Sequence, residues 1–184
     1  VTYGAGGSTR DRTHQIVRRV RRESDVEPAA HLTCVDASRA SIEEVIRSYQ
    51  TIGVRHIVAL RGDPADGVGS TYVPHPQGFQ STAELVAAIR RAGDIEVSVS
   101  AYPEKHPESR DLDADIDVLK AKVDAGATRA ITQFFFDNQH FYRFRDRLEK
   151  RGIDIPVIPG ILPVTKFAQA ARFAKQCGAE IPDW

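Results

Sequence analysis

The chain has 184 residues, of which 41% are hydrophobic and 27% are charged, so it is long enough to bury a hydrophobic core within one domain. Its 25 Lys and Arg residues balance its 25 Asp and Glu residues, which argues against a nucleic-acid-binding or membrane-surface-binding protein, because both classes usually carry a basic excess. No apolar run approaches the roughly 18 residues of a membrane helix and no signal peptide is visible, so we expect a cytoplasmic protein that binds neither nucleic acid nor membrane.

Short apolar runs rich in β-branched residues alternate along the chain with longer segments of helical period. The predicted strands are Val1–Tyr3, Ala30–Cys34, His56–Leu60, Glu96–Ala101, Ala130–Phe135 and Pro156–Pro159. The predicted helices cover residues 10–23, 39–52, 81–92, 111–125, 138–151 and 165–177. This alternation predicts repeated βα units, which build parallel sheets covered by helices.

The ends of several helices carry signals of their own. Ser41 and Ser81 each precede a glutamate by three residues, which is the spacing of a capping box, so we expect both serines to cap helices. Five predicted helices stop at or just before a glycine, the residue that most easily adopts the left-handed conformation at a helix C-terminus. These glycines are Gly53, Gly93, Gly126, Gly152 and Gly178.

Polar or charged residues lie at the carboxyl end of nearly every predicted strand. They are Thr2 and Tyr3, His31 and Thr33, Arg61 and Asp63, Tyr102 and Glu104, and Gln133. In a doubly wound sheet the ligand contacts concentrate at one switch point, whereas in a (β/α)8 TIM barrel all strand ends face the same mouth. The distribution therefore favours the α/β barrel. About six of its eight units are present, so we expect residues 1–184 to form a single catalytic barrel domain that is truncated at both ends.

The opening VTYGAGGST is rich in glycine, but its third glycine is misplaced for the dinucleotide fingerprint G-x-G-x-x-G. We interpret it as a strand end whose glycines let the loop pass close to a ligand. The two cysteines, Cys34 and Cys177, have no spacing typical of a metal or redox site, and we expect Cys34 to be a buried thiol. No histidine or carboxylate motif for a metal is present, so we expect no metal.

The segment HIVALRGDP places Arg61 and Asp63 directly after an apolar strand. There they suit a ligand with both donors and acceptors, or they form a local ion pair. Gln133 is an amide in an apolar strand, so it needs a partner or faces the barrel mouth. We expect at least one of the rings of Phe134–Phe136 to lie in the core under the helices.

The segment AYPEKHPES contains prolines that stiffen a loop, as a binding surface requires. It presents Tyr102 and His106 to a ligand. We expect Glu104 and Glu108 in the same loop to be solvated charges.

Taken together, these segments resemble the 5,10-methylenetetrahydrofolate reductase family. The shared motifs run over essentially the whole chain, in the family's order: VTYG, RDRT, HLTC, GVRHIVALRGDP, SAYPEKHPE, KVDAGATRAITQFFFD and PGILPV. The resemblance implies a (β/α)8 barrel that binds FAD at the carboxyl ends of its strands. It also implies ping-pong reduction of methylenetetrahydrofolate to 5-methyltetrahydrofolate with NADH or NADPH, in one-carbon and methionine metabolism. We expect the full-length protein to be a homo-oligomer.

The resemblance also implies roles for single residues. Positions that match FAD contacts are Tyr3, Ala5, His31, Arg61, Gly62, Asp63, Tyr102, His106, Asp115 and Lys122. Positions that match contacts to the folate or the nicotinamide are Thr2, Gln133, Gln169 and Phe173. The implied catalytic residues are Asp63, which would lie near the flavin ring and the pterin, and Gln133, which would hydrogen-bond the substrate stacked on the flavin.

The sequence departs from the family pattern in several places. The family's general-acid glutamate belongs to the first barrel strand, and a folate-binding arginine belongs to the last; this sequence contains neither strand. Ala121 stands where the family has a basic residue beside Lys122, and a longer loop precedes Ser81 and Thr82, which leaves their match to flavin contacts open. These departures leave open a second hypothesis, an FAD-binding fragment without turnover. A third hypothesis, an aldolase with a Schiff-base lysine, is disfavoured because no lysine ends an apolar strand.

Overall fold

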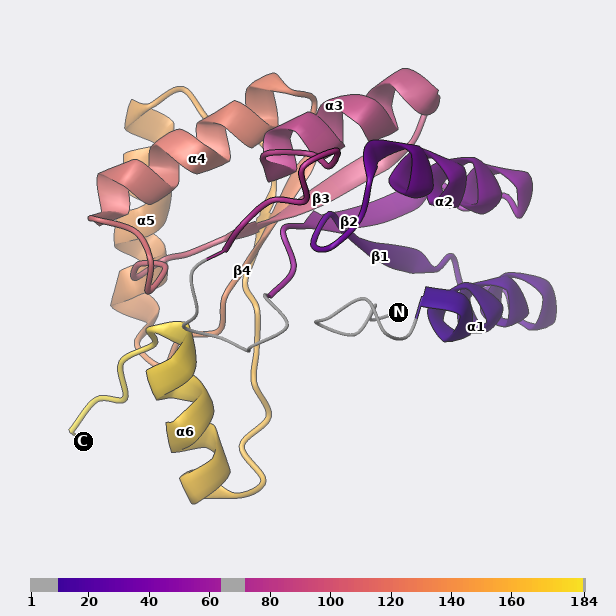
Figure 1. Cartoon of the computed structure of the whole chain (residues 1–184). Coiled ribbons are helices and arrows are strands. Elements are labelled where there is room, and N and C mark those ends of the chain that lie inside the picture. Colours follow the sequence, from indigo (N-terminus) through magenta and orange to yellow (C-terminus); the bar gives the residue numbers. More distant parts are fainter. Residues whose placement is uncertain (1–9, 64–71, 184) are drawn as a thin grey trace.

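The computed structural model describes residues 10–63 and 72–183. In these two ranges helices and strands alternate (Figure 1), in the order α1 (Arg10–Glu23), β1 (Ala29–Thr33), α2 (Arg39–Thr51), β2 (His56–Leu60), α3 (Thr82–Ala92), β3 (Glu96–Ala101), α4 (Leu112–Asp124), β4 (Arg129–Thr132), α5 (Asn138–Lys150), β5 (Val157–Ile158) and α6 (Phe167–Cys177). Each helix ends within one or two residues of its predicted bounds, which confirms the helical assignments. The predicted strand Val1–Tyr3 lies outside the described residues.

The five strands form one parallel sheet in the order β1-β2-β3-β4-β5. Each strand pairs with the next along the chain, so that His31 lies opposite Val58 and Val58 lies opposite Ser98. A doubly wound sheet reverses its direction of growth at a switch point, whereas a barrel adds every strand on the same side. The strand order therefore confirms a (β/α) barrel-type fold, of which the described residues contain five of the eight strands.

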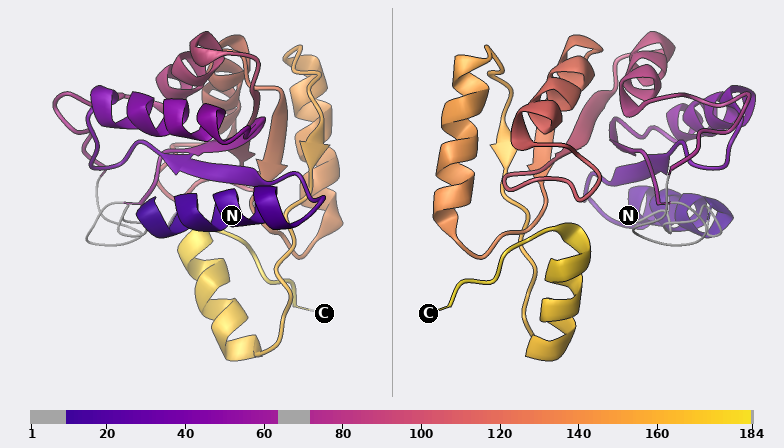
Figure 2. Two further views of the ribbon diagram at one scale, coloured as in Figure 1. Left: turned by 90° about the vertical axis from the view of Figure 1, so that its right-hand side faces the viewer. Right: turned by 60° about the vertical axis from the view of Figure 1, so that its left-hand side comes forward.

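The hydrophobic core lies between the sheet and the helices. Helices α2 to α5 follow one another along one face of the sheet (Figure 2). Alternate strand residues such as Leu32, Ile57 and Val97 are fully buried on this face. They pack in one cluster with Ile46 of α2 and Leu85 of α3. Because successive strand residues point to opposite faces, the residues in between face away from the helices.

The caps of two helices test the predicted serines. The side chain of Ser81 accepts a hydrogen bond from the backbone N–H of Glu84, which confirms it as the cap of α3. Helix α2 begins at Arg39, and its cap is Ser38, whose hydroxyl accepts from the backbone N–H of Ser41 at 3.2 Å. The prediction that Ser41 caps this helix is therefore wrong, because a serine three residues earlier satisfies the free N–H group.

Strand β4 ends at Thr132, three residues before its predicted end. The carbonyl of the Gln133 side chain accepts the backbone N–H of Phe134 at 3.0 Å, so this donor is not used in the sheet. The side chains of Phe134–Phe136 are all half-buried. Phe134 meets Phe136 edge to face, with ring centres 5.7 Å apart, and Phe135 stacks on Phe141 of α5. Phe135 therefore faces the helical layer, as expected of at least one of these rings, although none of the three is fully buried in the core.

Helix α6 extends away from the helical layer (Figure 1), and Ala170 and Ala174 are its only buried residues. Apolar side chains on or before it are exposed, among them Phe167 at 69% and Phe173 at 41%. Among the described residues, no helix combines the length and the apolar character that a membrane span requires.

Candidate active site at the carboxyl ends of the strands

Two cavities lie at the carboxyl ends of the strands. The first, of about 600 Å³, is lined by strand ends β1 to β3 together with α4, and we name it the α4-side cavity. The second, of about 420 Å³, is lined by strand ends β1 to β4 and by Gln176 and Cys177 of α6, and we name it the α6-side cavity. The residues common to both cavities include the predicted site residues His31, Arg61, Asp63, Tyr102 and His106. The two cavities therefore form adjoining parts of one groove.

The end of β2 passes close to the segment that follows β1. Gly62 has a φ of 86°, and a Cβ atom built on it would lie 2.5 Å from Cγ1 of Val35. Only glycine fits this approach, because any side chain would collide with Val35 and the left-handed backbone would be strained. The close approach holds Arg61 and Asp63, on either side of Gly62, at the groove.

Arg61 pairs with Glu108 across the groove. Its two terminal nitrogens lie 2.7 and 2.9 Å from the two carboxylate oxygens of Glu108, which is a bidentate ion pair. The guanidinium also lies 4.7 Å from the centre of the Tyr72 ring. The hydrogen bonds from Arg61 lower the pKa of Glu108 below its usual value. Glu108 is an exposed charge, as expected, that also takes part in this ion pair, and Arg61 uses Glu108 rather than Asp63 as its ion-pair partner.

Tyr102 and His106 lie edge to face, with their ring centres 4.8 Å apart. Burial raises the pKa of Tyr102 to about 12. Burial also lowers the pKa of His106, and the positive charge of Arg61 acts in the same direction. At neutral pH the phenol is therefore protonated and the imidazole is uncharged, so both side chains offer neutral hydrogen-bonding groups to a ligand.

Asp115, on the first turns of α4, fixes the loop that carries His106. One carboxylate oxygen accepts the backbone N–H of His106 at 2.7 Å, and the other accepts the hydroxyl of Ser109. Asp115 is 9% exposed and lines the α4-side cavity. Its carboxylate thus joins the start of α4 to the strand-end loop.

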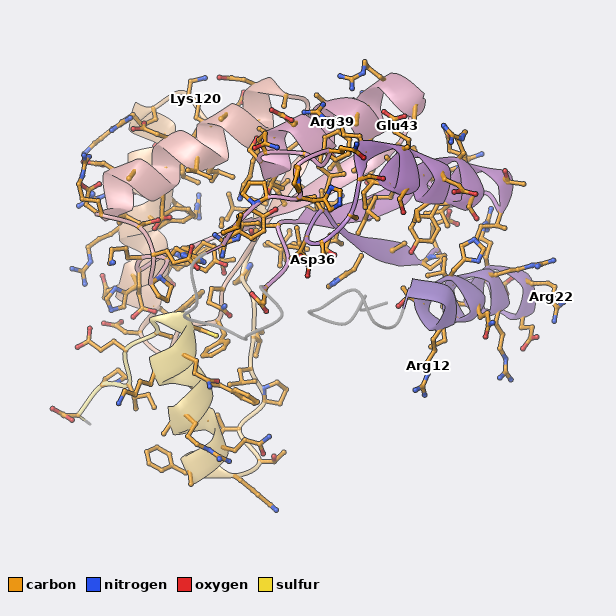
Figure 3. The ribbon with its side chains drawn as sticks, viewed as in Figure 1. Arg12, Arg22, Asp36, Arg39, Glu43 and Lys120 are labelled. Carbon is orange, nitrogen blue, oxygen red and sulfur yellow. The ribbon has the colours of Figure 1, made fainter. Side chains whose placement is uncertain are left out.

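The two lysines of α4 have opposite surroundings. Lys120 points away from the sheet (Figure 3) and pairs with Asp124 at 2.7 Å. Lys122 is 6% exposed, and its ammonium donates to the backbone carbonyl of Ser100 at 3.0 Å. Burial lowers the pKa of Lys122 to about 8, although the Asp115 carboxylate acts in the opposite direction. Lys122 therefore brings a buried cationic group to the wall of the α4-side cavity.

Gln133 lies directly after β4 and lines the α6-side cavity. Its carbonyl oxygen is engaged by the N–H of Phe134, and its amide nitrogen has no partner among the described residues. The side chain can therefore donate two hydrogen bonds to a ligand in this cavity.

Several predicted residues lie elsewhere. Gln169 and Phe173 of α6 are exposed and line neither cavity; α6 reaches the groove with Gln176 and Cys177 instead. Thr2, Tyr3 and Ala5 lie outside the described residues. Cys34 is fully buried, as predicted.

Thr82, which the sequence left open as a ligand contact, lines the α4-side cavity. Sequence reasoning missed other polar groove residues, among them Ser100, Ser109 and the two α6 residues. Ser100 had a signal, since Ser98 and Ser100 alternate with valines in EVSVSA and so lie on the face opposite the core.

Glu104 is also less exposed than expected. The Glu104 side chain is 12% exposed. One of its carboxylate oxygens lies 3.7 Å from Nε2 of His140 and accepts a hydrogen bond from the backbone N–H of Glu180 at 2.7 Å. Burial raises the pKa of Glu104. The side chains of Glu104, His140 and Glu180 could together hold a metal ion, because their ligand atoms lie within 4.8 Å of one another. Among the described residues this is the one such group, and it lies outside both cavities.

Comparison with known proteins settles the family. The family profile described as methylenetetrahydrofolate reductase matches residues 1–184, the entire chain. The chain belongs to the methylenetetrahydrofolate reductase family. Its relatives include the 5,10-methylenetetrahydrofolate reductases of Salmonella typhimurium and Escherichia coli, each 48% identical over 184 residues that make up all of this chain and 60% of the relative.

A plant relative shows the same likeness at a greater distance. The protein called methylenetetrahydrofolate reductase (NADH) 1 of Arabidopsis thaliana is 36% identical over 193 aligned residues, covering 99% of this chain and 32% of its own length. The chain thus spans about 60% of the length of its bacterial relatives in the reductase family.

Solved structures resemble this reductase-family chain in fold alone. A Burkholderia cenocepacia protein assigned as a phosphonomutase aligns with a TM-score of 0.60 at 16% identity, over 90% of this chain and 66% of its own. A 2,3-dimethylmalate lyase of the PEP mutase/isocitrate lyase superfamily aligns with a TM-score of 0.58 at 12% identity, over 94% of this chain and 65% of its own.

Proposed function

We propose that the protein to which these 184 residues belong reduces 5,10-methylenetetrahydrofolate to 5-methyltetrahydrofolate, with FAD as its bound cofactor and NADH or NADPH as the hydride donor. Membership of the reductase family supports the reaction. The observation that carries the proposal is the groove at the strand ends, where Arg61, Asp63 and Gln133 are brought together with Tyr102 and His106. We place the activity in the cytoplasm, in the one-carbon metabolism that supplies methionine, and expect a homo-oligomer.

The residues of the α4-side cavity fit a flavin dinucleotide. Lys122 and Arg61 carry the positive charge that a diphosphate requires. The hydroxyl of Thr33 is buried without a hydrogen-bond partner and lines this cavity, so a polar atom of a ligand can satisfy it. Lys122, Arg61, His106 and Asp115 would hold the cofactor together with His31 at the end of β1. Once bound, FAD supplies the hydride-accepting and hydride-donating ring.

The protein's own part is to bind and orient two flat ring systems against each other. Asp63 lines both cavities, so its carboxylate would reach the cofactor and the substrate from one position. Gln133 lines only the α6-side cavity, and its free amide N–H groups would orient the substrate there. Because one cavity would take the nicotinamide and then the folate, the two substrates react in turn, which is ping-pong behaviour.

The experiment follows the two half-reactions separately in the full-length protein. We expect the purified protein to bind FAD with a visible flavin spectrum, anaerobic NADH or NADPH to bleach it, and methylenetetrahydrofolate to restore it. We expect Asp63→Asn to slow reoxidation by the folate by about tenfold or more, and reduction by the pyridine nucleotide much less, because the carboxylate would lie beside the pterin.

Asp36→Asn is the matched control, because Asp36 is an exposed aspartate in the segment after β1 and does not line the groove (Figure 3). A protein that cannot be loaded with FAD would overturn the proposed function. Equal slowing of both half-reactions in Asp63→Asn would overturn the role of Asp63 alone.

A further inference from the structure

Thr33, the last residue of β1, holds a hydroxyl that the protein leaves unused. The residue is 3% exposed. Among the buried side-chain nitrogen and oxygen atoms of the described residues, Thr33 Oγ1 is the one without a hydrogen-bond partner. Buried polar groups are nearly always paired, because an unpaired one loses its hydrogen bonds to water and gains none in return. Such an orphan at the wall of a cavity points to a ligand.

The position of Thr33 specifies which part of the groove it serves. Thr33 lines the α4-side cavity and is absent from the lining of the α6-side cavity. Its Cβ lies 3.1 Å from the point where Gly62 would carry a side chain, so the absence of a side chain at Gly62 keeps the space beside Thr33 open. Thr82 and Ser100 add hydroxyls to the same cavity, and Lys122 adds a cation. A wall of hydroxyls that also carries the cations Lys122 and Arg61 suits a hydroxylated and phosphorylated ligand segment better than a flat ring.

We infer that the Thr33 hydroxyl is a ligand-binding group that hydrogen-bonds the polyol–phosphate portion of the cofactor in the α4-side cavity. This inference rests on the proposed function, since that function names the cofactor. None of the motif residues matched to the family's FAD contacts is Thr33, so the orphaned hydroxyl alone assigns it. The hydroxyl both donates and accepts, so it can pair with a ribityl hydroxyl or with a phosphate oxygen.

The inference predicts effects of opposite sign on the empty and the loaded protein. Thr33→Val replaces the hydroxyl with a methyl group of nearly the same shape. In the protein without FAD, this removes an unpaired buried polar group, so the melting temperature rises by about 2–4 °C. In the loaded protein a hydrogen bond is lost, so the dissociation constant for FAD increases by about 3- to 10-fold. Thr33→Ser keeps the hydroxyl and retains most of the affinity.

Thr132 provides the matched control for stability. It is also a threonine at the end of a strand and is 5% exposed, but its hydroxyl accepts the backbone N–H of Gly160 at 3.0 Å. Thr132→Val therefore leaves the backbone N–H of Gly160 without its hydrogen-bond acceptor, and the melting temperature of the empty protein falls. The opposite signs of the same substitution at the two sites separate an orphaned hydroxyl from a paired one.

The measurements are thermal unfolding without flavin and titration of the full-length protein with FAD and with lumiflavin, which has the ring but neither the polyol nor the phosphates. We expect Thr33→Val to weaken FAD and leave lumiflavin binding unchanged. Unchanged FAD affinity in Thr33→Val, or a lower melting temperature of the empty variant, would overturn the inference while the proposed function stands. Equal weakening of lumiflavin would overturn the assigned portion of the cofactor. Wild-type protein that binds no FAD would overturn the proposed function and this inference with it.

Discussion

Lys122 is a buried cation that is unfavourable for stability in the empty protein and favourable for binding an anionic ligand. Its ammonium is buried away from water and donates hydrogen bonds to the backbone carbonyl and to the hydroxyl of Ser100. Asp115 supplies negative charge nearby, yet burial still lowers the pKa of Lys122 to about 8. A cation that is costly in the empty protein becomes useful once an anionic group arrives, so its presence is better explained by a ligand than by stability.

This conflict predicts a pH dependence of stability. Between about pH 8 and the usual lysine pKa of about 10.4, the unfolded chain holds the Lys122 proton and the folded chain has released it. The unfolded state then binds more protons, so the free energy of unfolding rises with pH across this window. We expect this rise in the wild-type protein relative to Lys122→Met, measured by urea unfolding without flavin at several pH values from 7 to about 10.

Lys120→Met is the control on the same helix. Lys120 is 44% exposed on its side chain and pairs with Asp124 at the surface, so its removal should leave the slope of stability against pH as in the wild type. Parallel curves for the wild type and Lys122→Met would show that the burial of Lys122 does not govern its protonation.

At the scale of elements, the junction of β4 and β5 depends on one glycine. A Cβ atom on Gly160 would lie 2.1 Å from the backbone oxygen of Thr132, and backbone cannot move aside as a flexible side chain can. We expect Gly160→Ala to lower the free energy of unfolding by about 2–3 kcal/mol, because the segment after β5 must shift away from β4. Urea unfolding measures the loss.

Gly152, at the end of α5, is the control that distinguishes the effect of steric crowding from the effect of a left-handed backbone conformation. It has a φ of 66°, and an added Cβ would meet nothing within 4 Å. Gly152→Ala should therefore cost only the left-handed strain of about 1–2 kcal/mol, and its fold at the groove should be unchanged. If Gly160→Ala proved as mild as or milder than Gly152→Ala, the close packing of β4 against the segment after β5 would be contradicted.

The elements also show how far the sequence alone can lead. Helix bounds followed from periodicity and from glycines such as Gly53, which does adopt a positive φ of 77° after α2. The groove residues at the ends of β1 to β4 followed from the rule that parallel strands end at one edge. The cap of α2 could not be predicted from the sequence, because Ser38 and Ser41 are both suitable and only the backbone path selects between them.

Other features depend on contacts that no local pattern contains. The Arg61–Glu108 pair joins residues 47 positions apart, and its geometry is set by two loops that meet only in the folded chain. The early end of β4 results from one side chain, Gln133, competing for a backbone donor. The predicted substrate contacts of α6 came from motif matching, whereas the structure brings the end of that helix to the groove. The roles of all these residues toward ligands remain predictions.

At the scale of the whole molecule, the sheet is open in the described part of the chain. Strands β1 and β5 each pair on one side only. Around β5 and the start of α6, apolar side chains are exposed in succession: Ile158 at 44%, Ile161 at 83%, Val164 at 53% and Phe167 at 69%. A free strand edge next to an exposed apolar segment is a ready template for association with another chain.

We therefore expect the 184-residue chain to self-associate through this segment as its concentration rises. The double substitution of Ile161→Lys with Phe167→Lys should shift the equilibrium toward the monomer, because two charges would have to be buried in the contact. Val26→Lys is the control, since Val26 is an isolated apolar residue before β1 and 65% exposed. Sedimentation equilibrium over a range of concentrations distinguishes the three proteins. A wild-type chain that stays monomeric, or an equal effect of Val26→Lys, would show that the edge beside β5 is not the surface through which the chains associate.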